Sequence, residues 1–305
     1  QSDHVRLPRF ALTEPKQPIA RRQIPAGPSC GGPFPARDEF ARSSDPDNKG
    51  KKMPAKTAAI LAIGDELLSG RTRDANIHFI AGWLGERGIS LKEARIVADD
   101  ESAIVEALNA LRTRYDYCFT SGGIGPTHDD ITYEAVAKAF GREIVEHPDA
   151  IRLIRAWYEA KGEPVTPPRR RMALMPAGAE IIPNPVSGAP GVRIENVFVM
   201  AGVPSIFQGM LGAVEAALER GVFIHARVVT AMGLPESRLA EQLLAIQSAL
   251  RGVAIGSYPI DGDVKGVTIV ARSENESAAD AAIASVSAAM RALGFEPQPG
   301  ERAGR

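Results

Sequence analysis

Short strand-like runs alternate with amphipathic segments along residues 57–140. The first run is apolar throughout, as in a strand covered on both faces, and two further runs are predicted as strands: Thr57–Ile63, Leu91–Val97 and Tyr115–Thr120. Segments that begin near Asp74, Glu101 and Ile131 repeat apolar residues every three or four positions, which predicts helices. The order βαβαβα predicts an α/β fold, a three-layer, mostly parallel sheet with helices on both faces.

The pattern continues with longer connections. Helices are predicted over Pro148–Lys161 and from Pro204 to about Arg220, and a strand over Asn196–Met200. The proline-rich stretch Glu163–Pro168 predicts a loop, and Asn184–Gly191 a dense turn between two strand-like runs. We expect two of the arginines 169–171 to lie on a solvated helix face and one to reach a phosphate.

The character of the chain changes at Phe223. Residues 223–294 predict the order βαββα, with a capping box at Ser277–Asp280 opening the last helix. We therefore expect four parts: a disordered extension over residues 1–52, the main α/β domain over 53–221, a small α+β accessory or dimerisation domain over 222–296, and a tail over 297–305.

The first 52 residues carry eight prolines and no hydrophobic period, which predicts disorder. Met53 stands directly before the first strand, so one hypothesis is that the native chain begins there. An arginine-rich transit peptide is the rival explanation, and four acidic residues between positions 38 and 47 weaken it.

Composition excludes several classes of protein. A formal net charge of −1 gives no global attraction to nucleic acid, and the arginines at 169–171 form only a local patch. No apolar run approaches the length of a membrane span, and no signal-peptide pattern opens the chain. The two cysteines, Cys30 and Cys118, lie far apart in sequence, so we expect a reducing, cytoplasmic compartment.

The segment Ser121–Thr132 follows the third strand and combines two opposed features. Gly122, Gly123 and Gly125 allow backbone N–H groups to form a cradle for an anion. Asp129 and Asp130 place two carboxylates beside it. Either Asp130 caps the next helix and Asp129 is solvated, or the carboxylates bind a cation or the hydroxyl or amine groups of a ligand.

The predicted topology favours the second alternative. Each of three acidic pairs directly follows a strand: Asp65 and Glu66, Asp99 and Asp100, Asp129 and Asp130. Since the carboxyl ends of parallel strands share one sheet edge, these pairs are expected on one rim. A second strand, glycine turn and helix at Gly202 is expected to add another backbone cradle there.

Several long motifs resemble one family. Gly64–Gly70 with Asp74 and Asn76, Gly122–Thr132, and Asn184 with Gly188–Gly191 are similar to the molybdopterin-binding (MoaB/Mog) domain in its competence/damage-inducible protein A (CinA) form. The resemblance covers about residues 57–294. It implies a three-layer α/β fold, a homo-oligomer, and binding of a pterin or nucleotide. It also implies that Asp100 and Asp130 are functionally important.

Two departures from the family qualify the resemblance. Longer relatives carry a C-terminal amidase domain for which this chain has no room, so amidase activity is not expected. The last residue of the segment 201–206 is Ile206, where the family usually has a glutamate. This replacement puts in doubt any metal or hydroxyl contact at that position.

The CinA-type resemblance implies a metal-dependent pyrophosphatase acting on ADP-ribose or FAD, with Mg²⁺, Mn²⁺ or Co²⁺. The catalytic candidates are Asp100, Asp129 and Asp130, with His128 as a weaker candidate base, and the metal candidates are Asp65, Asp100 and Asp130. Residues predicted to bind the ligand are Gly64, Ser121, Gly122, Gly123, Gly125, Pro126, Thr127, Asn184, Gly188, Gly191 and Gly202. The main alternative is a molybdopterin-binding protein without hydrolytic activity, and a scaffold that has lost its chemistry ranks last.

Overall fold

The computed structural model describes residues 55–262 and 264–300. The predicted disorder of residues 1–52 and the last five residues of the predicted tail lie outside these ranges. Among the described residues, no helix is long and apolar enough to cross a bilayer.

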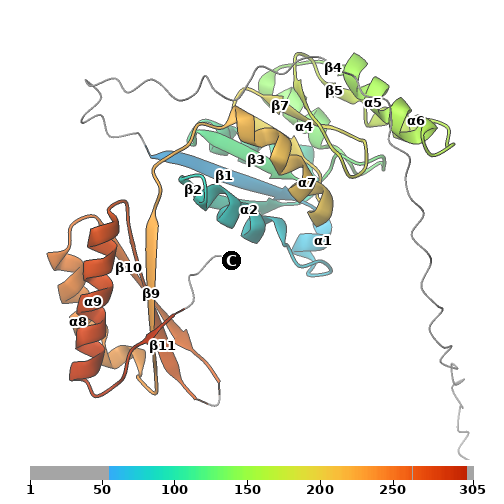
Figure 1. The fold of residues 1–305 in the computed structure, drawn as a ribbon. Coiled ribbons are helices and arrows are strands. Elements are labelled where there is room, and N and C mark those ends of the chain that lie inside the picture. Colours follow the sequence, from blue (N-terminus) through green and yellow to red (C-terminus); the bar gives the residue numbers. More distant parts are fainter. Residues whose placement is uncertain (1–54, 263, 301–305) are drawn as a thin grey trace, which may run out of the picture. The chain divides into compact units, whose positions relative to one another are not determined.

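A six-stranded sheet forms the first folded part (Figure 1). Four neighbouring strands are parallel, in the order β2 (Ile89–Val97), β1 (Lys56–Ile63), β3 (Tyr117–Ser121), β8 (Val197–Met200). Antiparallel strands β7 (Gly191–Ile194) and β6 (Glu180–Ile182) complete it beyond β8. The prediction of a mostly parallel α/β sheet is confirmed.

Helices cover both faces of this sheet because its central strand is apolar on both sides. Leu61 of β1 packs in a cluster with Ile104 of α3 (Glu101–Arg112), together with residues of α4 (Thr132–Phe140). Ile60 faces the other way and packs with Ile80 of α2 (Asn76–Gly85) and Phe207 of α7 (Pro204–Val214). All five of these side chains are fully buried. A short 3₁₀ helix, Glu215–Ala217, follows α7.

The segment between α4 and β6, which we call the excursion, was only partly predicted. It contains a two-stranded antiparallel sheet of β4 (Ile144–Glu146) and β5 (Leu174–Pro176) and the helix α5 (Pro148–Glu159). The loop predicted over Glu163–Pro168 is wrong at its end, because α6 (Pro167–Arg171) begins within it. The two prolines at its end fit the first turn of a helix, where no backbone N–H is needed. The one-turn helix α1 (Asp65–Leu68) was also not predicted.

A four-stranded antiparallel sheet forms the second folded part. Its order is β10 (Val253–Ile260), β11 (Gly266–Ser273), β9 (His225–Met232), β12 (Gln298–Pro299). This part also contains two helices, α8 (Ala240–Ala249) and α9 (Glu276–Ala292), and a 3₁₀ turn, Glu236–Arg238. Its core is separate and includes Val229, Ile269, Val286 and Met290.

Two details of this part differ from the predictions. Asn275, not a Ser277–Asp280 capping box, caps α9, because its side chain accepts a hydrogen bond from Ala278 N–H at 3.2 Å. The predicted tail begins later than position 297, since β12 pairs with β9.

Candidate functional site

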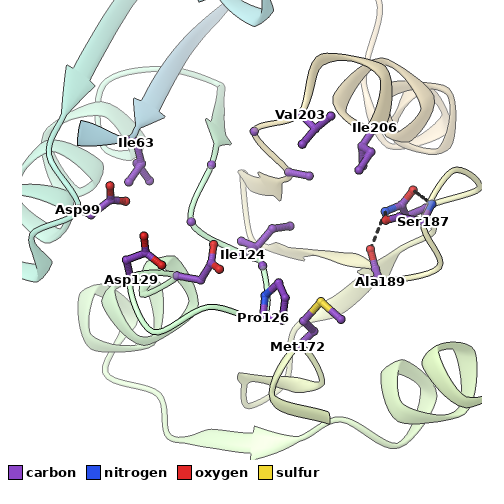
Figure 2. Close-up of a pocket in the computed structure, with 18 of the residues that line it drawn as sticks. Ile63, Asp99, Ile124, Pro126, Asp129, Met172, Ser187, Ala189, Val203 and Ile206 are labelled. Atoms are coloured by element: carbon purple, nitrogen blue, oxygen red, sulfur yellow. Dashed lines mark hydrogen bonds between the residues drawn. The ribbon is translucent and has the colours of Figure 1, made fainter. Parts of the chain in front are cut away.

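A pocket of about 570 Å³ lies at the carboxyl ends of β1, β3 and β8 (Figure 2). Its lining comes from the segments after β1, β2 and β6, from the β3–α4 loop and from the β8–α7 turn. The excursion contributes Tyr158 and Met172. This volume falls within the range of small-molecule sites. The position agrees with the rule that open parallel sheets bind ligands at the carboxyl ends of their strands.

The β3–α4 loop requires glycine at its start. Gly122 has φ 116°, and a Cβ there would lie 2.2 Å from the carbonyl oxygen of Ile63. Its N–H donates to the Met200 carbonyl at 3.2 Å, and its own carbonyl accepts from the Thr132 hydroxyl at 2.9 Å. These contacts hold the loop tightly against the neighbouring strands.

The next part of the loop leaves backbone donors free. Among the described residues, the N–H groups of Gly123, Ile124 and Gly125 donate to no acceptor, although all three residues line the pocket. The same holds, within the described chain, for the N–H groups of Gly202 and Val203 in the β8–α7 turn. A Cβ on Gly202 would lie 3.1 Å from the Gly122 Cα, so the two turns are in contact. Together these unpaired N–H groups, which we call the amide row, suit the binding of an anion.

A buried asparagine connects the two turns by hydrogen bonds. Asn76, 3% exposed, donates through Nδ2 to the Ser121 hydroxyl at 2.8 Å and to the Gly202 carbonyl at 2.7 Å. Since Ser121 is itself 3% exposed, its side chain supports the turns and does not line the pocket.

Carboxylates occupy one side of the pocket, which we call the acidic end: Glu66, Asp99 and Asp129. In Figure 2, Asp99 and Asp129 lie on the same side, opposite Val203 and Ile206. Asp99 accepts a hydrogen bond from Asp65 N–H at 2.9 Å. Burial raises the pKa of Asp99; the Asp65 N–H opposes this, and the negative charges of Asp65, Glu66 and Asp129 raise the pKa further. Negative charge at Asp99 is therefore incompletely compensated, whereas a hydrogen bond from the Thr127 side chain lowers the pKa of Asp129.

Two other aspartates are engaged within the chain. Asp100 caps α3, accepting from Ala103 N–H at 2.8 Å, and does not line the pocket. Asp130 lines the pocket, and its Oδ2 accepts from both the N–H and the hydroxyl of Thr127. Asp130 does not cap α4, whose cap position is Ile131 with no side-chain bond. It closes the turn that carries Asp129.

The three arginines of α6 each have protein partners. Arg171 donates to the carbonyl oxygens of Thr127 at 2.8 Å and Asp130 at 3.0 Å, which fixes the outer part of the β3–α4 loop. Arg169 pairs with Glu163, and Arg170 with Glu146. Arg171 therefore lies at the rim and holds loop carbonyls there, and the pairing of one arginine with a phosphate stays a prediction.

Apolar side chains occupy the opposite side, which we call the apolar end: Tyr158, Met172, Val203 and Ile206. The nearby Asn184 has no free valence for a ligand. Its Oδ1 accepts from the N–H groups of Val186 and Ser187, and its Nδ2 donates to the Ser187 hydroxyl and the Ala189 carbonyl. Asn184 therefore shapes the loop after β6, as the dashed bonds in Figure 2 show.

Comparison with known proteins agrees with this geometry. A family model described as a probable molybdopterin binding domain matches residues 59–220. The chain belongs to this molybdopterin-binding domain family. A second model, described as the FAD synthase middle domain, matches residues 224–298. The resemblance inferred from the motifs is confirmed.

Individual relatives of this domain family extend the match. A protein of Pyrobaculum calidifontis is 37% identical over 243 residues, 74% of this chain and 93% of the relative. A CinA-like protein of Gloeobacter violaceus is 34% identical over 251 residues, 78% of this chain and 58% of the relative. The chain therefore spans a little over half the length of that CinA-like relative. The crystal structure of the protein CinA from Thermoplasma acidophilum is 33% identical, with a TM-score of 0.50, and covers 54% of this chain and 99% of that one.

Within this molybdopterin-binding domain, many predicted ligand residues share the pocket. Its lining includes Gly64, Gly122, Gly123, Gly125, Pro126, Asn184, Gly202, Asp129 and Asp130. The other predicted site residues do not line it: Asp65, Asp100, Ser121, Thr127, Gly188 and Gly191. Gly188 packs against Trp157, since a Cβ there would lie 2.3 Å from the Trp157 Cγ, and Gly191 packs against the Val199 carbonyl.

Sequence reasoning missed other members of the site. Tyr158 packs against the hydrophobic core and also lines the pocket, and Met172 and Val203 line it too. Asp99 was recognised only as half of an acidic pair. The signal that separates it from Asp100 is the helix start at Glu101, because the residue directly before a helix is the one that caps it.

Metal binding by Asp65, Asp100 and Asp130 stays a prediction. Over residues 55–262 and 264–300, no group of three or more His, Cys, Asp or Glu side chains is arranged to hold an ion. Homo-oligomer formation and a cytoplasmic location also stay predictions.

Proposed function

We propose that the pocket binds a nucleotide with a diphosphate group and that the protein hydrolyses the diphosphate bond. The observation that carries the proposal is the contact between two glycine turns whose N–H groups are free: Gly123–Gly125 in one turn, Gly202 and Val203 in the other. One turn is suited to hold one phosphate. Two adjacent turns are suited to hold two linked phosphates.

The acidic end fits a divalent cation that bridges to such a ligand. Mg²⁺ binds typically through one or two carboxylates plus substrate phosphates, so a cluster of three protein ligands is not required. Asp99 and Asp129 are the carboxylates that would hold the ion, since both line the pocket and Asp100 does not. The raised pKa of Asp99, due first to burial and in part to neighbouring carboxylates, supports a place for positive charge here. A bound ion would polarise a phosphoryl oxygen and lower the pKa of water.

The chain's own groups would divide the work of hydrolysis. The free amides hold the phosphoryl oxygens and stabilise negative charge that builds up on them. Asp129 is exposed at the mouth of the pocket and is the candidate base that accepts a proton from the attacking water. Asp130 and Arg171 keep this part of the loop in place.

Two neighbouring aspartates provide a matched test. Turnover of ADP-ribose and FAD is measured as release of AMP with Mg²⁺, Mn²⁺ or Co²⁺ and with chelator. Asp99→Asn should lower kcat by about 100-fold or more. Asp100→Asn should stay within about threefold of the parent, because asparagine caps a helix as well as aspartate does. Equal loss in both variants, or no turnover by the parent chain, would overturn the assignment.

The alternative is a molybdopterin-binding protein that does not cut its ligand. The description of the matching family favours it. Titration calorimetry with molybdopterin separates the two functions. Submicromolar binding by a chain that releases no AMP from either nucleotide supports the alternative.

A further inference from the structure

Apart from the Tyr158 hydroxyl, the apolar end of the pocket has almost no free group with which to bind a polar ligand. The four hydrogen-bonding valences of the Asn184 amide are all used within its own loop. The Ser187 hydroxyl already accepts one of these bonds and retains its own proton to donate. The Gly202 carbonyl accepts from Asn76. A ligand edge with several N–H or O–H groups would lose its bonds to water here without replacing them.

The apolar side chains are fixed in position and open to the pocket. Val203 is 54% exposed although it lies in a turn at the pocket wall, and Met172 is buried on the opposite wall. The Arg169 guanidinium lies 3.8 Å from the centroid of the Tyr158 ring and pairs with Glu163, which holds that ring in place. Covering a rigid apolar surface of this kind with a ligand ring favours binding, because both apolar surfaces leave water.

The two ends of the pocket therefore differ in what they can bind. Figure 2 shows Asp99 and Asp129 on one side and Val203 and Ile206 on the other, with the glycine loop and Pro126 between them. A ligand that crosses the amide row would have its diphosphate at the centre. One half would then reach the carboxylates, and the other would lie against Ile206 and Val203.

We infer that the apolar end selects nucleotides whose second half is a large aromatic ring with an apolar edge, and that Ile206 and Val203 set this preference. The inference rests on the proposed function and specifies its substrate class. The inference places the adenosine half, which both ligands share, at the acidic end. FAD then brings a large ring with an apolar edge to the apolar end, and ADP-ribose brings only a ribose. The preference should be at least about tenfold, which corresponds to only about 50–60 Å² of additional apolar burial.

Equilibrium binding of FAD and ADP-ribose to the full chain tests the inference, with Mg²⁺ and separately with chelator. Ile206→Glu should weaken FAD binding by about tenfold or more, because the ring would desolvate a carboxylate, and change ADP-ribose binding by less than about threefold. Val203→Glu should act in the same direction at a side chain that is already half exposed and outside the buried core. Ile206→Leu should retain the preference.

Ile96→Glu is the matched control, since Ile96 is 42% exposed on β2 and does not line the pocket. It should leave both affinities unchanged. Equal affinity of the parent chain for FAD and ADP-ribose would overturn the inference and leave the proposed function standing. Equal losses of affinity for both ligands in Ile206→Glu and Val203→Glu would have the same consequence. Failure of both ligands to bind in either buffer would overturn the proposed function, and the inference with it.

Discussion

The two glycine turns of the pocket use the same backbone device with different side chains. Each follows one of two neighbouring parallel strands, β3 or β8, and each presents free N–H groups to the cavity. The β3–α4 turn is long and carries Asp129 and Asp130. The β8–α7 turn passes directly into α7 through Pro204. Val203 lies in this turn, and Ile206 lies in the first turn of α7. In both turns the backbone is suited to bind phosphate, and the side chains determine which ligand group can bind next to that phosphate.

The longer turn also needs more support. Its outer part depends on Arg171 and on the Asp130–Thr127 bonds, whereas the shorter turn is closed by the helix that follows and by Asn76 beneath it. Mutations should therefore affect the two turns unequally.

The largest expected difference is between Gly122→Ala and Gly202→Ala. At position 122 the new Cβ would meet the Ile63 carbonyl at 2.2 Å, with φ at 116°. The free energy of unfolding should fall by about 3 kcal/mol or more. At position 202 the nearest atom is the Gly122 Cα at 3.1 Å, and a loss of about 1 kcal/mol is expected. Urea unfolding measures both, and equal losses would contradict the packing described here.

A smaller effect is expected from Arg171→Gln, which should loosen only the longer turn. Loss of the bonds to the Thr127 and Asp130 carbonyls should lower the free energy of unfolding by about 1 kcal/mol. ADP-ribose should bind about threefold to tenfold more weakly, because the loop is less preorganised. Arg170→Gln, at a surface pair with Glu146, is the control and should change stability by less than about 0.5 kcal/mol. Matching effects of the two variants would contradict a specific role for Arg171.

The smallest expected effect is a pH-dependent difference at the acidic end. The pKa of Asp99 is raised, first by burial, so the folded state binds its proton more tightly than the unfolded state. Its contribution to stability is therefore present below the ordinary aspartate pKa of 3.8 and lost as pH rises through the raised pKa of the folded state. Asp99→Asn should gain Tm relative to the parent at pH 7 and not at pH 3. Asp100→Asn provides the comparison, and the same pH trend in both variants would contradict the assignment.

The sequence predicted the sheet and the turns because both leave local signals. The apolar run of β1 requires cover on both faces, and the glycines after β3 follow a strand and precede a helix. The start of α3 at Glu101 was predicted correctly, but Asp100 was chosen over Asp99 from the family resemblance, and its position directly before the helix, which makes it the cap, was not used. Tyr158 and Met172 could not be placed, since the excursion returns them to the pocket through contacts distant in sequence. Prolines 167 and 168 gave a loop signal, yet both fit the first turn of α6.

A crystal structure of the full chain with ADP-ribose and Mn²⁺ tests the central claim most directly. The account predicts one phosphate within hydrogen-bonding distance of the Gly123–Gly125 amides and the other at Gly202 and Val203, with the ion held by Asp99 or Asp129. A diphosphate bound away from these two turns, or an ion held by Asp65 and Asp100 instead, would contradict it.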